Sequence, residues 1–276
     1  MLENFNLLGK TALITGAAGL LGVEHAAALI ECGANVVLTD LHDVDLSKAK
    51  KKLLLEYANA SIIFHEMDVS NINSIISVKE KLDAEGKFID ILINNAAIDP
   101  KVASDGNVIE TSRLENFSRD DWDLQISVGL TGAFQTAKIF GSDMAKRKAR
   151  GVILNIASDL SVFSPDQRLY YRNNLNDDLQ PVKPVTYSVI KSGLVGLTRY
   201  LATYWIKEGI RSNALSPGGV FNGQSEEFVQ KLSNLIPLGR MANKNEYRSA
   251  IQFLCSDASS YMNGQNIVMD GGRSVW

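Results

Sequence analysis

Apolar residues along the chain gather in two kinds of segment: short continuous runs and longer stretches with helical spacing. Residues 10–15 are a short, mostly apolar run that ends at glycine, and residues 35–40 are rich in β-branched side chains. Such runs are typical of strands that are covered on both faces. Between them, residues 20–32 have helical periodicity and are followed by Gly33, a common helix terminator. The first forty residues therefore predict a strand, a helix and a second, parallel strand.

The same alternation of strand and helix continues to the end of the chain. Further helices are expected at 46–58, 71–85, 120–148, around Tyr187, at 225–235 and at 243–255, and further strands at 61–67, 89–94, 152–156, 211–216 and 266–269. Alternating elements of this kind fold into a parallel sheet that helices cover on both faces. We therefore predict an α/β fold with a doubly wound parallel sheet of about seven strands. No break in composition divides residues 1–276, which predicts a single domain.

Two connections are longer than the few residues that usually join a strand to a helix. Residues 99–118 are polar and rich in turn formers, and residues 159–184 contain Pro165, Pro181 and Pro184. Both segments follow the carboxyl end of a predicted strand, where a doubly wound sheet binds its ligands. We predict that both are substrate loops.

Composition and charge narrow the classes of function. The chain has 276 residues, of which 45% are hydrophobic and 21% charged, and these values indicate a globular protein with a full core. Its formal net charge of −3 gives no positive field for nucleic acid. Neither a membrane span nor a secretory signal is predicted, so we expect a cytoplasmic protein. The two cysteines and three histidines lack ligand spacing, and no metal site is predicted.

A glycine-rich turn lies between the first strand and the first helix, at Thr15-Gly16-Ala17-Ala18-Gly19-Leu20-Leu21-Gly22. Glycines let the backbone approach a diphosphate, which the first amides of the next helix can bind. Asp40 ends the second strand, where a carboxylate accepts hydrogen bonds from an adenosine ribose and repels a 2′-phosphate. The alternative role for Asp40 is that of a turn or helix-capping residue. Together, the turn and Asp40 predict a Rossmann-like nucleotide site that prefers NAD to NADP.

A phenol and an ammonium are expected on one face of a helix, at Tyr187 and Lys191. A tyrosine titrates at about 10 in water, so it exchanges protons poorly at neutral pH unless a cation favours the phenolate. Lys191 is placed to be that cation. The strand before this helix ends in Ser158, a hydrogen-bond donor, with Ser161 as a weaker candidate. Such groups suit a reaction in which a hydride leaves a carbon while a positioned side chain takes the hydroxyl proton.

In this order, the motifs resemble those of the short-chain dehydrogenase/reductase family, and the resemblance covers nearly the whole chain apart from the two long loops. It rests on the glycine-rich turn, Asp68 after the third strand, Asn94-Asn95-Ala96-Ala97 after the fourth, Ser158, Tyr187-Ser188-Val189-Ile190-Lys191 and Ser216-Pro217-Gly218, with further matches at 237–241, 253–257 and 270–272. The resemblance implies an NAD-dependent oxidoreductase that moves a hydride between the nicotinamide and a secondary alcohol or ketone, with a sugar or sugar phosphate as the candidate substrate.

The resemblance also implies roles for individual residues. Ser158 would hold the substrate oxygen, Tyr187 would transfer the proton, and Lys191 would lower the tyrosine pKa while bonding the nicotinamide ribose. The implied cofactor-binding residues are Gly16, Gly19, Leu21, Asp40, Asp68, Val69, Asn95, Ala96, Ala97, Tyr187, Lys191, Pro217, Gly218 and Val220. Family members often associate through the helix that here carries Gly193 and Gly196, so a homodimer or homotetramer is expected. The other partner is a small-molecule substrate, with neither nucleic acid nor membrane.

Two departures favour a different branch of the family. Leu20 stands where the shorter branch has its middle glycine, and the glycines of the turn are instead spaced as in the extended branch of sugar-nucleotide epimerases and dehydratases. The interval from Ser158 to Tyr187 is also longer than in the shorter branch. Against this, residues 217–272 resemble the shorter branch, and no appended substrate domain is found. We therefore predict the shorter, single-domain branch, with an epimerase or dehydratase that holds NAD as the alternative.

A third departure concerns proton transfer. Gly129 stands where the family commonly has an asparagine that is thought to hold a water between the lysine and solvent. Glycine has no side chain for this role. Either a water or a backbone group replaces it, or proton exchange with solvent is slower, or the protein binds a dinucleotide without catalysis.

The loop at 159–184 carries candidates for binding an anionic sugar, namely Arg168, Tyr170, Tyr171, Arg172 and Lys183. Cationic side chains form charge-assisted hydrogen bonds, and tyrosines stack on sugar rings. The alternative is a solvated insertion that binds nothing. Residues 164–170 and 216–223 also resemble a bacterial subgroup linked to surface-sugar or flagellin-glycan biosynthesis.

Overall fold

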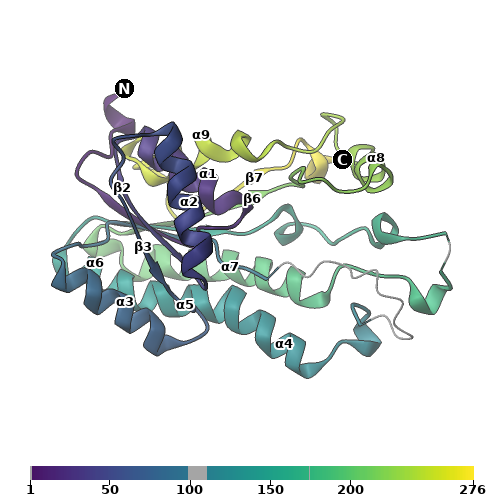
Figure 1. Ribbon diagram of the computed structural model, residues 1–276. Coiled ribbons are helices and arrows are strands. Elements are labelled where there is room, and N and C mark those ends of the chain that lie inside the picture. The colour runs from purple at the N-terminus through teal and green to yellow at the C-terminus, as the bar shows by residue number, and fades with distance from the viewer. Residues whose placement is uncertain (1, 99–110, 174) are drawn as a thin grey trace.

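The computed structural model describes residues 2–98, 111–173 and 175–276. Within them, seven parallel strands form one sheet in the order β3-β2-β1-β4-β5-β6-β7 (Figure 1). The strands are β1 (Thr11–Thr15), β2 (Asn35–Asp40), β3 (Ile62–Glu66), β4 (Ile91–Asn94), β5 (Val152–Ile156), β6 (Arg211–Pro217) and β7 (Asn266–Met269). The predicted doubly wound sheet is confirmed. Its strand order reverses between β1 and β4, which is where such sheets bind their ligands.

Helices cover both faces of the sheet (Figure 1). One face carries α1 (Leu20–Glu31), α2 (Asp43–Glu56) and α9 (Arg248–Cys255). The other face carries α3 (Ile72–Ala84), α4 (Arg119–Ile126), α5 (Gly132–Thr136), α6 (Ser142–Arg147) and α7 (Val185–Tyr204), and α8 (Glu226–Ser233) lies beside the carboxyl-terminal residues. None of the described helices has the length and apolarity that a membrane span requires.

The core forms two apolar layers because neighbouring residues of a strand point to opposite faces. In β1, Ala12 and Ile14 contribute to the layer under α1, α2 and α9, whereas Leu13 contributes to the layer under α3 and α7. Leu13 pairs with Val37 of β2 and Leu92 of β4 in the sheet. The central strands are therefore buried on both sides, as their continuous apolar runs predicted.

Residues 119–147 form one helical rod, close to the predicted range 120–148, but the rod is not uniform. Its α-helical segments are joined by π-helical turns at Ser127–Thr131 and Ala137–Gly141. Glycines in these turns bring the rod close to its neighbours, because a Cβ at Gly129 would lie 2.8 Å from Ile190 of α7 and a Cβ at Gly141 would lie 2.5 Å from the ring of Trp205. Periodicity predicted the helix, but it did not indicate these π-helical turns.

The loop at 159–184 is folded back on itself through short 3₁₀ turns at Asp159–Ser161, Gln167–Tyr170 and Asp177–Leu179. Gln180 fastens it: its side-chain oxygen accepts the N–H of Arg172 at 2.8 Å, and its nitrogen donates to the carbonyls of Arg172 at 2.8 Å and Leu175 at 2.7 Å. Of the other predicted loop, residues 99–110 lie outside the described residues.

A histidine side chain lies inside the core. His25 of α1 is fully buried, and neither of its ring nitrogens has a hydrogen-bond partner among the described residues. Burial lowers the pKa of His25 to about 3, because a charged ring is unfavourable without water.

We expect His25 to make the free energy of unfolding depend on pH. The unfolded chain protonates His25 near pH 6.5, whereas the folded chain does so only near pH 3. The unfolded state therefore binds more protons in this range, and stability falls as the pH falls. Between pH 7 and pH 5 the loss from this group is about 2 kcal/mol. Urea unfolding should show that His25→Leu loses about 2 kcal/mol less than the wild type over this range; equal losses would contradict the prediction.

Candidate active site

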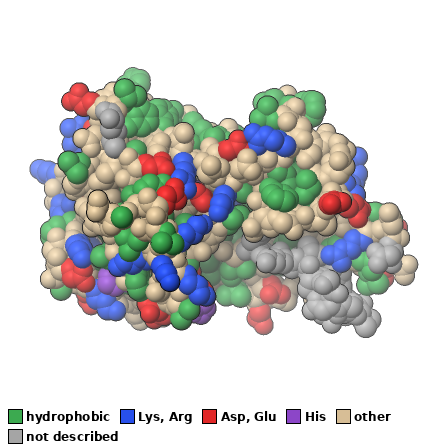
Figure 2. All heavy atoms as spheres, turned by 45° about the horizontal axis from the view of Figure 1, so that its top comes forward, with side chains coloured by type: hydrophobic (Ala, Val, Ile, Leu, Met, Phe, Trp, Pro, Cys, Tyr) green, Lys and Arg blue, Asp and Glu red, His purple; other side chains and the backbone are tan. Residues whose placement is uncertain are grey.

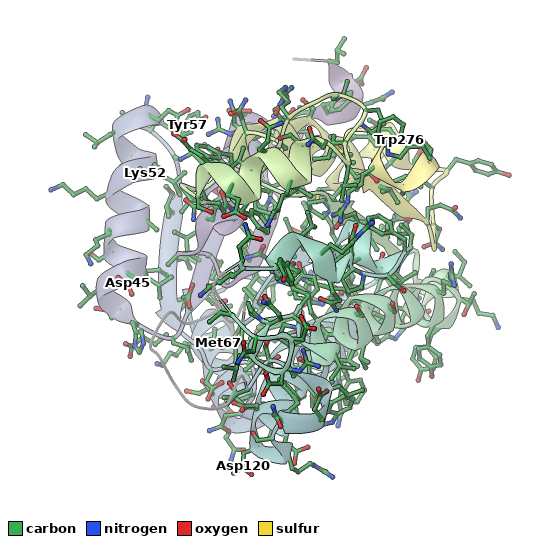
Figure 3. All side chains as sticks on the ribbon, turned by 90° about the vertical axis from the view of Figure 1, so that its right-hand side faces the viewer. Asp45, Lys52, Tyr57, Met67, Asp120 and Trp276 are labelled. Atoms are coloured by element: carbon green, nitrogen blue, oxygen red, sulfur yellow. The ribbon has the colours of Figure 1, made fainter. Side chains whose placement is uncertain are left out.

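A cleft of about 860 Å³ opens at the carboxyl ends of the strands, a volume in the upper part of the range for ligand pockets. Figure 3 looks toward this edge of the sheet, with Met67, which lines the cleft after β3, near the centre. Every residue predicted to be catalytic or cofactor-binding, from Gly16 to Val220, lines this one cleft. The fold thus brings together residues that were predicted at the ends of separate strands and, for Tyr187 and Lys191, on a helix.

The glycine-rich turn is held against the end of β4. Asn95 donates its side-chain amide to the carbonyl oxygens of Thr15 at 3.0 Å and Gly16 at 2.9 Å, and the Thr15 hydroxyl accepts the backbone N–H of Asn95 at 3.0 Å. Gly16 has a φ of +61°, and a Cβ there would lie 2.8 Å from the Cα of Ala96. Only glycine fits this position, because the backbone needs the positive φ and the end of β4 fills the space.

The amino end of α1 is open toward an anionic group. Its cap, Gly19, has no side chain to accept the first helix amides, and no acidic residue lies in the first turn. Helix amides that no side chain caps, together with the helix dipole, favour a bound phosphate. The residues present at this end of the cleft therefore fit the diphosphate of a dinucleotide.

Asp40 borders the cleft beside this turn. Its Oδ2 accepts the N–H of Ala18 at 3.0 Å, and its Oδ1 accepts the N–H of Leu41 at 2.8 Å. The carboxylate thus fastens the glycine-rich turn to β2, which is the turn role considered above, and each oxygen still has a lone pair for a ribose hydroxyl. Asp68, which follows β3, also holds a turn in place. Its Oδ1 accepts the backbone N–H of Ser70 at 2.9 Å and the hydroxyl of Ser70 at 2.6 Å.

The three side chains predicted to react all line the cleft. Ser158 follows β5 and is buried, and the buried Lys191 of α7 donates its ammonium to the carbonyl of Ile156 at 2.9 Å. The Lys191 nitrogen lies 5.7 Å from the centre of the Tyr187 ring, and the Lys183 nitrogen lies 3.8 Å from it. Two ammonium groups thus lie beside the ring of Tyr187.

Gly129 lies in the π-helical turn at Ser127–Thr131 and faces Ile190 of α7. The Cβ contact described above shows that the Ile190 side chain occupies the space into which an asparagine at 129 would extend. Lys191, next to Ile190, bonds instead to the carbonyl of Ile156. A backbone carbonyl therefore contacts the ammonium, and the effect of Gly129 on proton transfer stays a prediction.

The substrate side of the cleft contains only some of the predicted residues. Tyr170 and Lys183 line it, whereas Arg168, Tyr171 and Arg172 do not. The Arg168 side chain is 87% exposed and pairs with Asp166 at 2.7 Å. The hydroxyl of Ser161 lies 3.0 Å from that of Ser216 and is outside the cleft lining, so Ser158 is the better placed of the two candidate serines.

Two charged side chains of the cleft were not predicted from the sequence. Arg273, close to the carboxyl end, pairs with Asp159 at 3.1 Å, and their side chains are 9% and 5% exposed. Burial raises the pKa of Asp159, although its bond to Ser158 and the charge of Arg273 act in the opposite direction. The partners are 114 positions apart, so no local pattern indicates the pair. The one indication in the sequence is that Asp159 directly follows Ser158, the predicted active-site serine.

Charged side chains of both signs lie close together on the face in Figure 2. Several basic side chains adjoin one another toward the left of this face, with acidic side chains beside them. The face thus carries charges of both signs.

Comparisons with known proteins agree with these features. A family model described as short chain dehydrogenase matches residues 10–172, and one described as Enoyl-(Acyl carrier protein) reductase matches residues 179–274. The D-threitol dehydrogenase of Mycolicibacterium smegmatis is 31% identical over 277 residues, which cover 99% of this chain and 95% of that protein.

Two solved structures resemble the whole chain. A gluconate 5-dehydrogenase from Burkholderia cenocepacia, in complex with NADP and tartrate, has a TM-score of 0.82 and 27% identity, covering 99% of this chain and 98% of that one. A short chain dehydrogenase from Leptospira borgpetersenii with bound NAD+ has a TM-score of 0.83 and 29% identity, covering 100% of this chain and 97% of that one.

Proposed function

Because the chain belongs to the short-chain dehydrogenase/reductase family, we propose that it interconverts a secondary alcohol and its ketone with a nicotinamide dinucleotide. The observation that carries this proposal is the single cleft lined both by the glycine-rich turn and by Ser158, Tyr187 and Lys191. The bound dinucleotide would supply the hydride acceptor or donor. The relatives reported above that carry an enzyme name are dehydrogenases, which favours this reaction over epimerisation.

In the proposed reaction, Tyr187 takes the hydroxyl proton of the substrate while a hydride leaves the carbon that bears this hydroxyl. Ser158 bonds the substrate oxygen and thereby holds that carbon in place. Lys191, whose ammonium is fixed by the carbonyl of Ile156 at 2.9 Å, stabilises the phenolate and bonds the ribose next to the nicotinamide. Because Ser158 and Lys191 are both buried, these hydrogen bonds form away from bulk water, where they are stronger.

The proposed cofactor is NAD rather than NADP. The solved relatives include one with NADP and one with NAD+, so the family alone does not decide between them. Asp40 favours NAD, because its carboxylate borders the cleft beside the glycine-rich turn and would repel a 2′-phosphate.

Asp40→Asn should lower the preference for NAD over NADP, measured as the ratio of the two kcat/KM values, by about tenfold. The amide keeps an oxygen for the N–H of Ala18 but lacks the charge that repels a phosphate. Asp83→Asn removes an exposed carboxylate on α3 and should leave the ratio unchanged. A wild type that already prefers NADP would contradict the role of Asp40.

The proposed substrate is a secondary alcohol of a polyol or a sugar acid. Relatives named for threitol and gluconate support this class. The cleft wall formed by the later half of the chain combines cations with aromatic rings, through Lys183, Arg273, Tyr170 and Phe228, and this mixture suits a chain with hydroxyl and carboxylate groups. The likeness of residues 164–170 to the surface-sugar or flagellin-glycan subgroup gains no support from these relatives.

A substrate panel tests the proposed function. D-Threitol, D-gluconate, a sugar phosphate and a nucleotide-linked sugar are each offered with NAD and with NADP, and NADH or NADPH formation is followed by absorbance. We expect turnover of a polyol or a sugar acid. Conversion of the nucleotide-linked sugar without net NADH would favour the epimerase alternative, and NADH binding without any turnover would contradict the proposed oxidoreductase activity.

A further inference from the structure

Arg273 has hydrogen-bond donors that the protein does not use. Its side chain is 9% exposed, and it lines the cleft together with Asp159. A guanidinium has five N–H donors, but within the described part of the chain only Nη1 bonds to another side chain, at 3.1 Å to Oδ2 of Asp159. The Nε and Nη2 atoms have no such bond, and neither is fully buried. Because Arg273 lines the cleft, these donors are open to a molecule bound there.

Two contacts hold the guanidinium of Arg273 in place. Its central carbon lies 4.9 Å from the centre of the Phe163 ring, and its Nη1 is tied to Asp159. The side of the group formed by Nε and Nη2 keeps two parallel N–H bonds, the arrangement with which an arginine binds both oxygens of a carboxylate. A planar group that is already fixed loses little further freedom when it binds a ligand.

The part of the cleft around Ser158 has more positive than negative side chains. The charged residues that line it there are Lys183, Lys191 and Arg273, against the single carboxylate of Asp159. The other two carboxylates of the cleft lie at the ends of β2 and β3. The whole chain, in contrast, has a formal net charge of −3. A cleft lined by one sign of charge concentrates ligands of the opposite sign, so this part of the cleft favours an anion.

Only one carboxylate group separates Arg273 from Ser158. The Ser158 hydroxyl donates to Oδ1 of Asp159 at 2.9 Å, and Arg273 donates to Oδ2 of the same side chain. A small molecule with an alcohol at Ser158 can therefore extend a second group as far as the guanidinium. The Asp159 carboxylate repels such a group only weakly, because its oxygens already accept hydrogen bonds from Ser158, Leu160 and Arg273.

We propose that Arg273 is the residue that selects a sugar acid, by binding the substrate carboxylate while the secondary alcohol of the same molecule lies at Ser158. This inference rests on the proposed function and narrows its substrate class from polyols and sugar acids to sugar acids. A neutral polyol leaves the guanidinium donors without a charged acceptor, and hydrogen bonds to charged groups are the stronger ones.

Two ligands that differ mainly in charge test this assignment. D-Gluconate and D-gluconamide carry the same hydroxyl groups, but the amide is neutral. Each ligand is titrated by calorimetry into the enzyme with NADH, because an alcohol and NADH cannot exchange a hydride. We expect the wild type to bind D-gluconate about thirtyfold more tightly than D-gluconamide. Equal affinities would overturn the inference, and this comparison needs no variant to fold.

Arg273→Lys should lower the preference for D-gluconate by about tenfold. Lysine keeps a positive charge beside Asp159 but lacks the second nitrogen with which arginine binds a carboxylate. The affinity for D-gluconamide should not change, whereas a structural defect would weaken the binding of both ligands. Arg168→Lys makes the same substitution at an arginine that pairs with Asp166 and lies outside the cleft lining, and it should leave the preference unchanged.

The remaining outcomes separate this inference from the proposed function. If the preference for D-gluconate survived in Arg273→Lys and disappeared in Lys183→Gln, the carboxylate would bind the lysine and the inference would be wrong. A wild type that turns over a neutral polyol of the panel, yet binds D-gluconate no better than D-gluconamide, would contradict this inference and leave the proposed function standing. A wild type that turns over nothing in the panel would overturn the proposed function, and this inference with it.

Discussion

Tyr187→Phe should lower kcat by about a thousandfold while NADH still binds. Phenylalanine fills the same volume beside Lys183 and Lys191 but has no oxygen to take the substrate proton. The glycine-rich turn and Asp40 lie at the other end of the cofactor site and are untouched by the change. Steady-state assays on the best substrate of the panel measure kcat, and the fluorescence of bound NADH measures affinity.

Tyr200→Phe provides the matched control for this experiment. Tyr200 lies on the same helix, and its side chain is exposed, so loss of its hydroxyl should leave kcat unchanged. If Tyr187→Phe also turned over at the wild-type rate, the proton would have to pass through another group, and the assignment of Tyr187 would be wrong.

Gly22→Ala should weaken NADH binding by about a hundredfold, because a small displacement of a binding element has large effects. A Cβ at Gly22 would overlap the carbonyl oxygen of Gly16 and lie 2.7 Å from the Cα of Ala17. Both neighbours are backbone atoms, which cannot move aside as a flexible side chain can. The glycine-rich turn must therefore shift away from the start of α1. Fluorescence titration with NADH measures the loss.

Gly196→Ala is the control for this substitution. Gly196 lies within α7, and a Cβ there would meet no atom within 4 Å, so NADH affinity should not change. Melting curves of both variants show whether each one folds. A folded Gly22→Ala protein that binds NADH as tightly as the wild type would contradict the role of the turn in binding the dinucleotide.

The fold could be predicted from the sequence because its determinants are local. The β-branched run in β2 and the helical spacing of α1 each lie within a dozen residues, and their alternation leaves one class of parallel sheet. The rod at 119–147 shows where this reasoning stops. Its helical period is local, but the π-helical turns arise where Gly129 and Gly141 meet residues of α7 and the segment after it, and no pattern within the rod indicates them.

The candidate site shows the same difference between features set by local sequence and features set by distant contacts. The glycine-rich turn, Asp40 and the pair Tyr187 and Lys191 could be predicted because each belongs to a short motif in a recognisable position. Their presence along one cleft follows from the sheet, since parallel strands end at the same edge. The orientation of the Ser158 hydroxyl could not be predicted in this way. It depends on Asp159 and on an arginine that follows 114 positions later in the chain.

The position of Arg273 has a practical consequence for recombinant work. Arg273 lines the cleft three residues before Trp276, so an affinity tag fused after Trp276 would begin within one helical turn of the ion pair with Asp159. The amino terminus lies apart from this region, on the opposite side in Figure 1. Purification handles and immobilisation chemistry are therefore best attached ahead of Met1, so that kinetic constants describe the unmodified enzyme.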